Sequence, residues 1–369
     1  MSVTIFTMTH KKFPTPGDPV YVPLQVGRAG ASDLGYIGDD TGVSISEKNC
    51  YYGELTGVYW VWKNIRTTDY VGICHYRRYF CTEEGRILTA GEYENILSEY
   101  DIITSKRLKL NFSYYEGYAG DYNIHDLDAV GEVIRQFYPA YYGTFAKLVQ
   151  GRGTYFGNMC VCKKEIYDAY CEWLFGIFEK AEGKINASSY DDYHKRVYGF
   201  ISEFLLYVWV QARGLKAYEC KVGMTDEKRE TTETKEKLAA YFARKDIAGA
   251  KEYILSCLEK RPDILMEASD ITGELKLSMQ VIAVCELEKQ AYGSSTIDRI
   301  QEFSALMAHF GKLNDLILSY KEGVALREIK LFLEKENITL IALEASARLF
   351  YPQKEAREIA ERILGCAEG

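Results

Sequence analysis

Apolar residues in the first 225 positions follow two spacings in turn. Short apolar runs, typical of buried strands, are separated by longer segments whose apolar residues recur every three or four positions, as on one face of a helix. The runs lie at residues 3–10, 69–75, 101–104 and 215–223 and around Cys160 and Cys162, which stand two apart and so face one side of a strand. Strands that alternate with helices predict an α/β fold, with a mixed, mainly parallel sheet and flanking helices.

Three expectations concern the segments between these runs. Prolines and glycines in "DPVYVPLQVGRAG" indicate a loop at residues 18–30. Ser46 is placed to cap the helix that follows, whose apolar residues stand at helical spacing. The tyrosine-rich segment 111–125 is expected to be a loop that enters a helix near Asp126.

The pattern changes after about Met224. A charged segment, "TDEKRETTETKEK", is expected to be a hinge, and only helical patterns follow it. They suggest helical hairpins somewhat like a tetratricopeptide array, although no fixed period occurs. Because 369 residues exceed what one hydrophobic core usually supports, we predict two domains. They are an α/β domain at residues 1–228 and an all-α domain at residues 229–369.

The composition, with 47% hydrophobic and 27% charged residues, is that of a globular protein. A net charge of −8 argues against nucleic acid as a partner, because proteins that bind it usually carry a basic face. The 30 tyrosines combine flat apolar rings with hydroxyl groups, which suits carbohydrate. No apolar run is long enough for a signal sequence or a membrane span, so we expect a cytoplasmic protein whose 10 cysteines are reduced.

The segment "DYVGICHYRRYF", residues 69–80, ends an apolar run with His75, Arg77 and Arg78. Ligands of open α/β sheets bind beyond the carboxyl ends of the strands, and two guanidinium groups there suit a phosphate or a carboxylate. The alternative is a pair of surface arginines bonded to nearby acids.

Other polar residues stand at expected strand ends or helix starts, namely His10, Gln25, Gly27, Asp39, Asp40 and Asn49. A nucleotide-sugar site needs such a mixture, because polar groups select the base and ribose while positive charge balances the diphosphate. These residues, with His75, Arg77 and Arg78, are therefore the expected contacts of a nucleotide-sugar donor.

Transfer of a sugar also needs a group that deprotonates the acceptor hydroxyl. The sequence offers Glu54, Asp121, Asp126 and Glu203, and does not choose among them. Glu203 stands beside an apolar helical stripe, where the alternative role is a structural bond to Arg196.

Asp126 and Asp128 form an Asp-x-Asp pair at the start of an expected helix, where acids commonly act as caps. A role as metal ligands or in acid–base chemistry is the alternative. His125, beside them, either binds acceptor hydroxyls or is a simple loop histidine. Glycine-rich nucleotide loops and a Gly-x-Ser-x-Gly motif are missing, which disfavours dehydrogenases, nucleotide hydrolases and α/β-hydrolases.

Five segments together resemble a family of bacterial proteins called domain of unknown function 4422. They are "YVPLQVG", "GDDTGVSISEKNCYYGELTGVYWVWKN", "DYVGICHYRRYF", "GNMCVCKKEIYDAYCEWLF" and "RVYGFISEFLLYVW", in order between about residues 4 and 225. Members belong to capsular and exopolysaccharide gene clusters and are regarded as glycosyltransferases. The chain departs from the family where relatives often have an "ERLL"-like stretch and this sequence has "EFLL".

The resemblance implies a GT-A-like, Rossmann-like fold that moves a sugar from a nucleotide diphosphate, with uridine diphosphate and galactose or galactofuranose as the expected donor. The acceptor would be a surface glycan on a lipid carrier, which suggests peripheral association with the inner face of a membrane. Expected acceptor contacts are Tyr114, Tyr115, Tyr122 and Asn158. The helical domain lies outside the resemblance and would bind acceptor, a partner enzyme or a second copy of the chain.

In many GT-A transferases an Asp-x-Asp at the end of a core strand binds a divalent metal. Here His75, Arg77 and Arg78 occupy the corresponding place, so our hypothesis is that the arginines replace the metal. A requirement for Mn²⁺ or Mg²⁺ stays open, because acids from different loops can converge in space. A second hypothesis, from another class, is a non-catalytic carbohydrate-binding or scaffold protein on a degenerate transferase fold.

Overall fold

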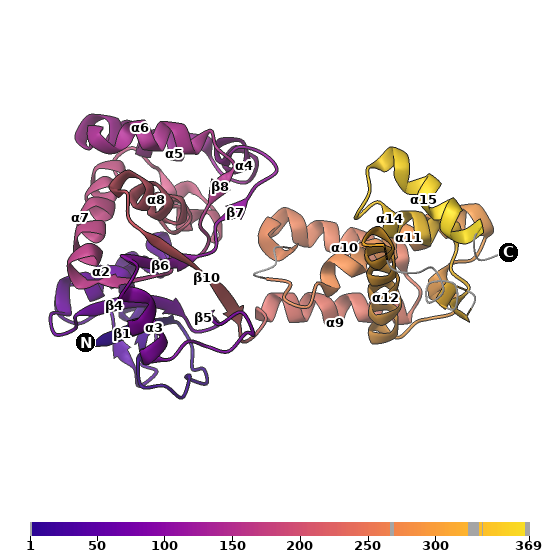
Figure 1. Ribbon diagram of the computed structural model, residues 1–369, viewed down its shortest axis with the longest axis horizontal. Helices are drawn as coiled ribbons and strands as arrows, with labels where there is room; N and C mark the ends of the chain where they lie inside the picture. The colour runs from indigo at the N-terminus through magenta and orange to yellow at the C-terminus, as the bar shows by residue number, and fades with distance from the viewer. Residues whose placement is uncertain (1, 266–268, 324–331, 334, 366–369) are drawn as a thin grey trace. The chain divides into compact units, whose positions relative to one another are not determined.

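The computed structural model describes residues 2–265, 269–323, 332–333 and 335–365. Its contacts divide the chain into two compact units, Met1–Thr225 and Asp226–Gly369, which are described separately here (Figure 1). The first unit combines a sheet with helices, and the described part of the second is helical. The boundary between the units lies a few residues before the one expected from the change in sequence pattern.

Unit 1 is built on an eight-stranded sheet in the order β3-β2-β1-β4-β5-β10-β6-β9, in which β9 also pairs with β4. The strands are β1 Val3–Thr9, β2 Tyr21–Gln25, β3 Ile37–Gly38, β4 Tyr70–His75, β5 Arg78–Cys81, β6 Ile102–Ser105, β9 Cys160–Lys163 and β10 Ala217–Met224. A separate pair joins β7 Leu108–Lys109 to β8 Gly153–Thr154.

The predicted mixed sheet is confirmed, but parallel pairings are not its majority. β1 is parallel to β2 and β4, β2 to β3, and β6 to β10. Among the described strands an equal number of pairings is antiparallel, because β9 runs against β4 and β6 and β5 runs against β4 and β10. The connection from β4 to β5 is only two residues long, which permits a hairpin but not a parallel crossover.

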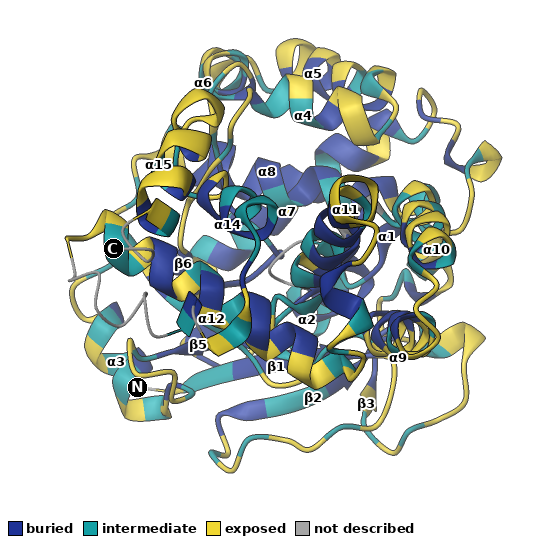
Figure 2. Cartoon of the chain, turned by 90° about the vertical axis from the view of Figure 1, so that its right-hand side faces the viewer, coloured by how far each residue is buried: buried dark blue, intermediate teal, exposed yellow. Residues whose placement is uncertain are grey.

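Helices cover the sheet of unit 1 in layers (Figure 1). They are α1 Asn49–Tyr52, α2 Leu55–Asn64, α3 Ala90–Leu97, α4 Tyr114–Asp121, α5 Ile124–Phe137, α6 Pro139–Val149, α7 Lys164–Ala181 and α8 Val197–Arg213. α7 packs against β4, β9 and α2, and the pair α5–α6 packs on α7 and α8, whereas α3 contacts β1 and β6. α8 is buried along nearly its whole length (Figure 2), so its position is fixed by packing on several sides.

The period of two along each strand divides the core between the two faces of the sheet. On β9, Cys160 and Cys162 belong to the larger core with α2, α7 and α8, while Val161 lies in the smaller core under α3. The expectation that the two cysteines share one side is confirmed. Gly72 of β4 leaves room for the side chains of its neighbours on β1 and β9, because a Cβ there would lie 2.4 Å from Ile5 Cδ1 and 2.7 Å from Val161 Cγ2.

The loop expected at residues 18–30 contains strand β2, so that prediction was wrong. Pro23 misled it, because proline cannot donate to a strand ladder. Two backbone bonds, from Val26 N to Thr9 O and from Asp39 N to Gln25 O, give the directions of the backbone groups in β2. The N–H and C=O groups of its odd-numbered residues face β3. β3 pairs only with Leu24 and Gln25, so the missing N–H of Pro23 falls beyond the end of that pairing.

Three helix starts also differ from the sequence prediction. Ser46 caps no helix: it begins a short 3-10 turn, and its hydroxyl donates instead to Asp39 Oδ1. The segment expected to be a tyrosine-rich loop contains α4, which begins with a capping box made by Ser113 and Glu116. In α5 the cap is Asn123, whose side chain accepts from His125 N, rather than Asp126.

Unit 2 is an array of packed helices. Its described helices include α9 Arg229–Ala243, α10 Ile247–Lys260, α11 Glu274–Tyr292, α12 Phe303–Lys321, α14 Leu340–Ala347 and α15 Gln353–Gly365. Most of the charged segment expected to be a hinge is helix α9, where the buried Lys235 forms ion pairs with Glu227 and Glu274. Within the described ranges, no helix is both long and apolar enough to cross a membrane.

Candidate active site

The parallel strands β1 to β4 place their carboxyl ends at one edge of the sheet. The register pairs Met8 with His75 and Thr9 with Gln25, so the residues that follow these strands are neighbours. The β4–β5 hairpin turns at this edge, where His75 lies opposite Arg78. It is held by bonds from Tyr76 N to Met8 O (3.0 Å) and from Thr225 N to Arg77 O (3.0 Å).

Two carboxylates and three cationic or titratable side chains meet beside this hairpin. They come from the start of α2, the hairpin and the beginning of α8: Glu54, His75, Arg78, Arg196 and Glu203. We call these five residues the hairpin cluster. Gly157, with φ +78°, leaves space for the hairpin arginine, because a Cβ there would lie 3.2 Å from Arg78 Nη1.

Asn158 fixes the position of Glu54. Its Nδ2 donates to Glu54 Oε1 (2.7 Å) and to Gly199 O (3.1 Å), and its Oδ1 accepts from Ser202 Oγ (2.7 Å). Arg196 Nη2 lies 3.5 Å from Glu54 Oε2. The carboxylate is thus tied to α8 by an amide and to the residue before α8 by a guanidinium.

Glu54 and His75 influence each other. Burial lowers the pKa of His75 to about 4, an effect opposed by the charge of Glu54 and reinforced by Arg78. Burial acts to raise the pKa of Glu54, but His75, Arg196 and the bond from Asn158 hold it below its ordinary value. At neutral pH the pair is therefore an ionised carboxylate beside a neutral imidazole.

Glu203 has the opposite tendency. Burial, together with the negative charge of Glu54, raises its pKa to about 8, while Arg78, the Gly157 backbone amide and Arg196 oppose the rise. Two neighbouring carboxyl groups thus differ at neutral pH, one ionised and one protonated. Environments that separate two such pKa values are typical of sites where one acid gives and the other takes a proton.

Arg77 and Arg78, which we call the hairpin arginines, form no ion pair with any acid in the part of the chain that the structure describes. Arg77 lies against the ring of Tyr76, 5.1 Å from its centroid. The buried atoms His75 Nε2 and Arg77 Nε have no hydrogen-bond partner among described residues. Buried polar groups of native proteins are normally bonded, so these atoms are available to a ligand. The sequence alternative, arginines bonded to local acids, does not describe this arrangement.

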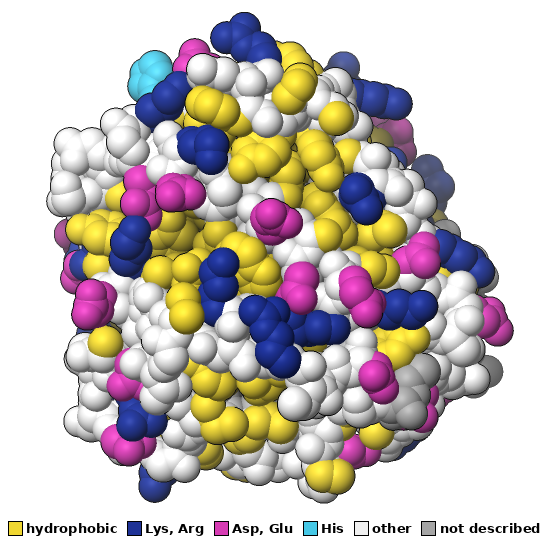
Figure 3. Space-filling view, turned by 90° about the vertical axis from the view of Figure 1, so that its left-hand side faces the viewer, with side chains coloured by type: hydrophobic (Ala, Val, Ile, Leu, Met, Phe, Trp, Pro, Cys, Tyr) yellow, Lys and Arg dark blue, Asp and Glu magenta, His cyan; other side chains and the backbone are white. Residues whose placement is uncertain are grey.

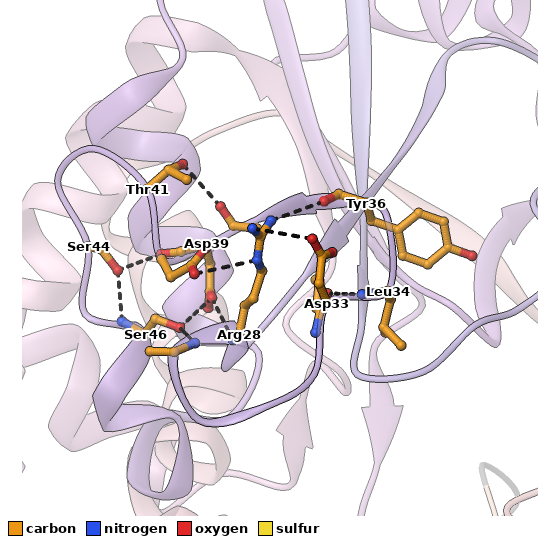
Figure 4. Close-up of polar contacts among 12 residues, drawn as sticks. Arg28, Asp33, Leu34, Tyr36, Asp39, Thr41, Ser44 and Ser46 are labelled. Carbon is orange, nitrogen blue, oxygen red and sulfur yellow. Dashed lines mark hydrogen bonds and ion pairs between the residues drawn. The ribbon is translucent and has the colours of Figure 1, made fainter.

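Other predicted donor contacts lie in a loop network farther along the same edge (Figure 4). Asp39 is buried and accepts from Gly27 N (2.9 Å), Arg28 N (3.1 Å) and Ser46 Oγ (2.5 Å). Arg28 Nε lies 3.4 Å from Asp40 Oδ2 and forms an ion pair with it. We call Gly27, Arg28, Asp39, Asp40 and Ser46 the Asp39 network.

The remaining predicted donor residues also make internal bonds. The Gln25 amide donates to Ser32 O (2.7 Å) and accepts from Leu34 N (2.9 Å). Asn49 donates to Gly53 O (2.7 Å). His10 lies nearer the hairpin, with its ring edge-to-face against Tyr76 at 5.3 Å.

The predicted acceptor residues separate into different surroundings. Tyr114 stacks on Phe204 with ring centroids 4.0 Å apart, and burial raises its pKa. Tyr115 donates to Asp128 (3.2 Å) at the surface. Asn158 donates to Glu54 of the hairpin cluster, and Tyr122 lines a pocket.

The pocket, of about 430 Å³, lies between the α4–α5 corner and residues 189–197. It contains two of the predicted acid–base candidates, Asp121 and Asp126. His125 is exposed at the start of α5 and is absent from the pocket lining. The predicted candidates therefore fall in two places: Glu54 and Glu203 at the hairpin, and the two aspartates in the pocket.

Sequence reasoning missed the bond of Arg196 to Glu54, because it considered only Glu203 as a partner for this arginine. It also missed Tyr190 and His194 of the pocket. The run "SSYDDYHKR" offered a signal, since aromatic, acidic and basic residues alternate there just before an apolar helix. Across the described residues, no group of three or more His, Cys, Asp or Glu side chains is placed to hold a metal ion.

Comparison with known proteins identifies the family. Residues 4–214 match the family described as domain of unknown function DUF4422. The chain is also similar to the apo structure of WbbM, a bifunctional glycosyltransferase, with 31% sequence identity and a TM-score of 0.55 over 61% of this chain. It spans 46% of that protein. No curated protein matches. Since the family match covers more than half of its residues, the chain belongs to the DUF4422 family.

Proposed function

We propose that unit 1 is a GT-A-like glycosyltransferase that takes a sugar from a nucleotide diphosphate, with uridine diphosphate as the expected carrier, and transfers it to a surface glycan. One observation carries the proposal: the hairpin arginines stand at the carboxyl edge of the sheet without an acid partner in the described chain, next to carboxyl groups of different protonation. The similarity to a bifunctional glycosyltransferase at 31% identity supports it.

In this proposal Arg77 and Arg78 bind the diphosphate. Guanidinium groups grip phosphate oxygens with paired, charge-assisted hydrogen bonds, and they stabilise the negative charge that develops when the sugar–phosphate bond breaks. The arginines thus supply the positive charge that a divalent metal supplies elsewhere.

Glu54 accepts the proton of the acceptor hydroxyl. It is ionised at neutral pH, and Asn158 and Arg196 fix its direction. The acceptor oxygen attacks the anomeric carbon of the donor, the bond from that carbon to the diphosphate oxygen breaks, and the diphosphate leaves with the electron pair. Glu203, protonated at the same pH, acts as a hydrogen-bond donor to substrate oxygen.

Calorimetric titration with uridine diphosphate tests the donor site, first with Mn²⁺ and then with a chelator. We expect binding to survive chelation. The double variant Arg77→Ala/Arg78→Ala should bind at least about 100-fold more weakly, because each of the two lost charge-assisted bonds costs roughly 1.5–3 kcal/mol. Arg66→Ala is the matched control, since this exposed arginine lies 3.8 Å from Asp168 and away from the hairpin.

Binding that requires Mn²⁺ would contradict the role given to the arginines. If neither uridine diphosphate nor any other nucleoside diphosphate bound, the donor proposal itself would be wrong. Slow release of sugar from uridine diphosphate-galactose then separates a transferase from a carbohydrate-binding scaffold, because a transferase leaks sugar to water and a scaffold does not.

A further inference from the structure

The pocket between α4, α5 and the residues before α8 has a lining distinct from that of the hairpin cluster. Its volume of about 430 Å³ is within the range of about 300–1,000 Å³ typical of small-molecule sites. Aromatic rings and small polar groups share its wall: Tyr118, Tyr122, Tyr190, Asn123, Asp126 and His194. Flat rings beside hydrogen-bonding groups are a surface that suits a sugar, whose faces are apolar and whose edges carry hydroxyls.

The polar groups of the pocket are held in fixed directions. Asp126, only 4% exposed, accepts from Tyr190 OH (3.0 Å), and Tyr190 in turn accepts from Asn123 Nδ2 (2.7 Å). Burial raises the pKa of Asp126. A carboxylate offers about four lone-pair positions, so one bond from Tyr190 leaves capacity for the hydroxyls of a ligand.

Tyr118 adds a second, independent sign of a ligand. Its side chain lines the pocket and is only 4% exposed, yet its hydroxyl has no hydrogen-bond partner in the described chain. Buried hydroxyls without partners are rare, since leaving one unbonded costs roughly 1–3 kcal/mol. A hydroxyl of a bound molecule would supply the bond.

The charges of the pocket restrict the class of ligand. Its lining residues include three aspartates and no lysine or arginine. Its one histidine, His194, is engaged on both ring nitrogens, with Asp191 Oδ2 at 2.6 Å and Asp121 O at 3.1 Å. A diphosphate would meet repulsion here, whereas a neutral molecule rich in hydroxyls would meet acceptors.

The first turn of α8 connects this pocket to the hairpin cluster. Val197 lines the pocket, and the preceding residue, Arg196, bonds to Glu54. Burial is the largest cause of the raised pKa of Tyr122, which also lines the pocket, and Tyr193 and the charge of Glu203 add to it. The pocket and the proposed base are therefore linked through adjacent residues at the start of α8.

From these observations we infer that the pocket is the acceptor subsite, which binds an uncharged sugar unit of the acceptor glycan through Asp126, Tyr118 and the tyrosine rings. This inference rests on the proposed function. It assigns the phosphate-bearing donor to the hairpin and the neutral sugar to the pocket.

The test is saturation-transfer NMR and calorimetry on the full chain with methyl glycosides of galactose, glucose, mannose and N-acetylglucosamine and their disaccharides. We expect at least one saccharide to bind. Asp126→Asn should weaken that binding about tenfold or more, because bonds to a charged acceptor contribute roughly 1.5–3 kcal/mol. Tyr118→Phe should weaken it several-fold. Asp192→Asn and Tyr100→Phe are matched controls: the Asp192 side chain is 99% exposed, and Tyr100 makes an edge-to-face contact with Tyr218 and does not line the pocket.

Uridine diphosphate binding, measured in parallel, separates the two proposals. If it persists in all four variants while no saccharide binds to the natural protein, the subsite is wrong and the donor site stands. Saccharide binding unchanged in both Asp126→Asn and Tyr118→Phe would also overturn the subsite, as would displacement of the saccharide by uridine diphosphate. Saccharide binding lost in the pocket variants, with no nucleotide binding at all, would support the pocket and refute the transferase.

Discussion

The Asp39 network and the hairpin cluster lie at the same edge of one sheet, and both combine acids with arginines, but they use these charges differently. In the Asp39 network the acids accept from backbone amides and a nearby arginine, so bonding is completed within the loop. In the hairpin cluster the imidazole Nε2 is left buried without a partner in the described chain, and two carboxyl groups differ in protonation. Polar residues at strand ends are best judged by the bonding capacity they have left.

The outer surface adds a third use of charge. On the face shown in Figure 3, Lys and Arg side chains are interspersed with Asp and Glu and with apolar patches. Exposed pairs of this kind contribute little to stability, with a median of roughly 0–1 kcal/mol. The hairpin arginines differ from them because they are partly buried and form no ion pair with an acid of the described chain.

The largest effect expected from the comparison is on turnover. Glu54→Gln removes the ionised carboxylate of the hairpin cluster while keeping its shape, so we expect the rate of sugar transfer to fall about 100- to 10,000-fold. Uridine diphosphate binding should stay within a few-fold of the natural protein. Transfer assays with Glu132→Gln as the control measure this, since Glu132 is exposed and pairs with Lys184.

A transfer rate within tenfold of the natural protein would place the base elsewhere. Asp121 and Asp126 of the pocket would then be the next candidates. The difference drawn between the two regions would lose its chemical meaning, because the hairpin cluster would be a charge network without a reacting group.

The next effect is on stability. Asp39→Ala leaves the Gly27 and Arg28 amides and the Ser46 hydroxyl without their buried acceptor, at a cost of roughly 1–3 kcal/mol for each group that finds no water. We expect the free energy of unfolding to fall by about 3–5 kcal/mol in urea denaturation. Arg77→Ala/Arg78→Ala, which breaks no ion pair among the described residues, should lower it by less than about 1 kcal/mol.

Equal losses of stability in the two variants would contradict the comparison, because the hairpin arginines would then serve the fold as Asp39 does. If Asp39→Ala kept its normal stability but lost nucleotide binding, the roles assigned to the two regions would be reversed. In that case Asp39 would be a donor contact, as the sequence suggested, and its internal bonds would be incidental.

The sequence predicted those parts of the molecule that depend on local pattern. Strands β1, β4, β6 and β10 were expected near their observed positions from local patterns, such as the alternation of apolar and small polar residues in β1 and the apolar run of β4. β2 was missed because Pro23 lacks the N–H that a strand ladder normally uses. The proline is tolerated because β3 pairs with Leu24 and Gln25 and not with Pro23, and this pairing depends on tertiary structure. The antiparallel position of β9 likewise depends on pairing with two strands distant in sequence.

The candidate site was predictable only as a set of residue types. The end of β4 at His75 was expected from the sequence, but strand β5, which begins at Arg78, was not. The sequence could not show that Asp39 accepts hydrogen bonds from the loop backbone. Nor could it show that Glu54 accepts one from Asn158, 104 positions away. The hydrogen-bonding capacity that a side chain has left depends on which residues pack around it. The residues of α8 and of the segment before β9 that pack around this site cannot be identified from the local sequence pattern.

The last effect concerns Glu203 and is measured as a change of stability with pH. Its pKa is raised to about 8 in the folded chain, above the value of about 4.3 expected in the unfolded chain. Between these values the native state holds a proton that the unfolded state has lost. The contribution of this residue to stability is therefore fully present below about pH 4 and declines as pH rises toward 8.

Glu203→Gln replaces a protonated acid by a neutral amide of nearly the same shape. At pH 5 we expect the free energy of unfolding to change by less than about 1 kcal/mol, because both side chains are then uncharged in the native state. At pH 8 the variant should be the more stable of the two, since it never ionises beside the Glu54 carboxylate. Urea denaturation at pH 5, 6.5 and 8, with Glu132→Gln alongside, measures the difference. Parallel pH profiles for the natural protein and Glu203→Gln would mean that Glu203 is ionised throughout, and both carboxyl groups of the hairpin cluster would then be candidates for the base.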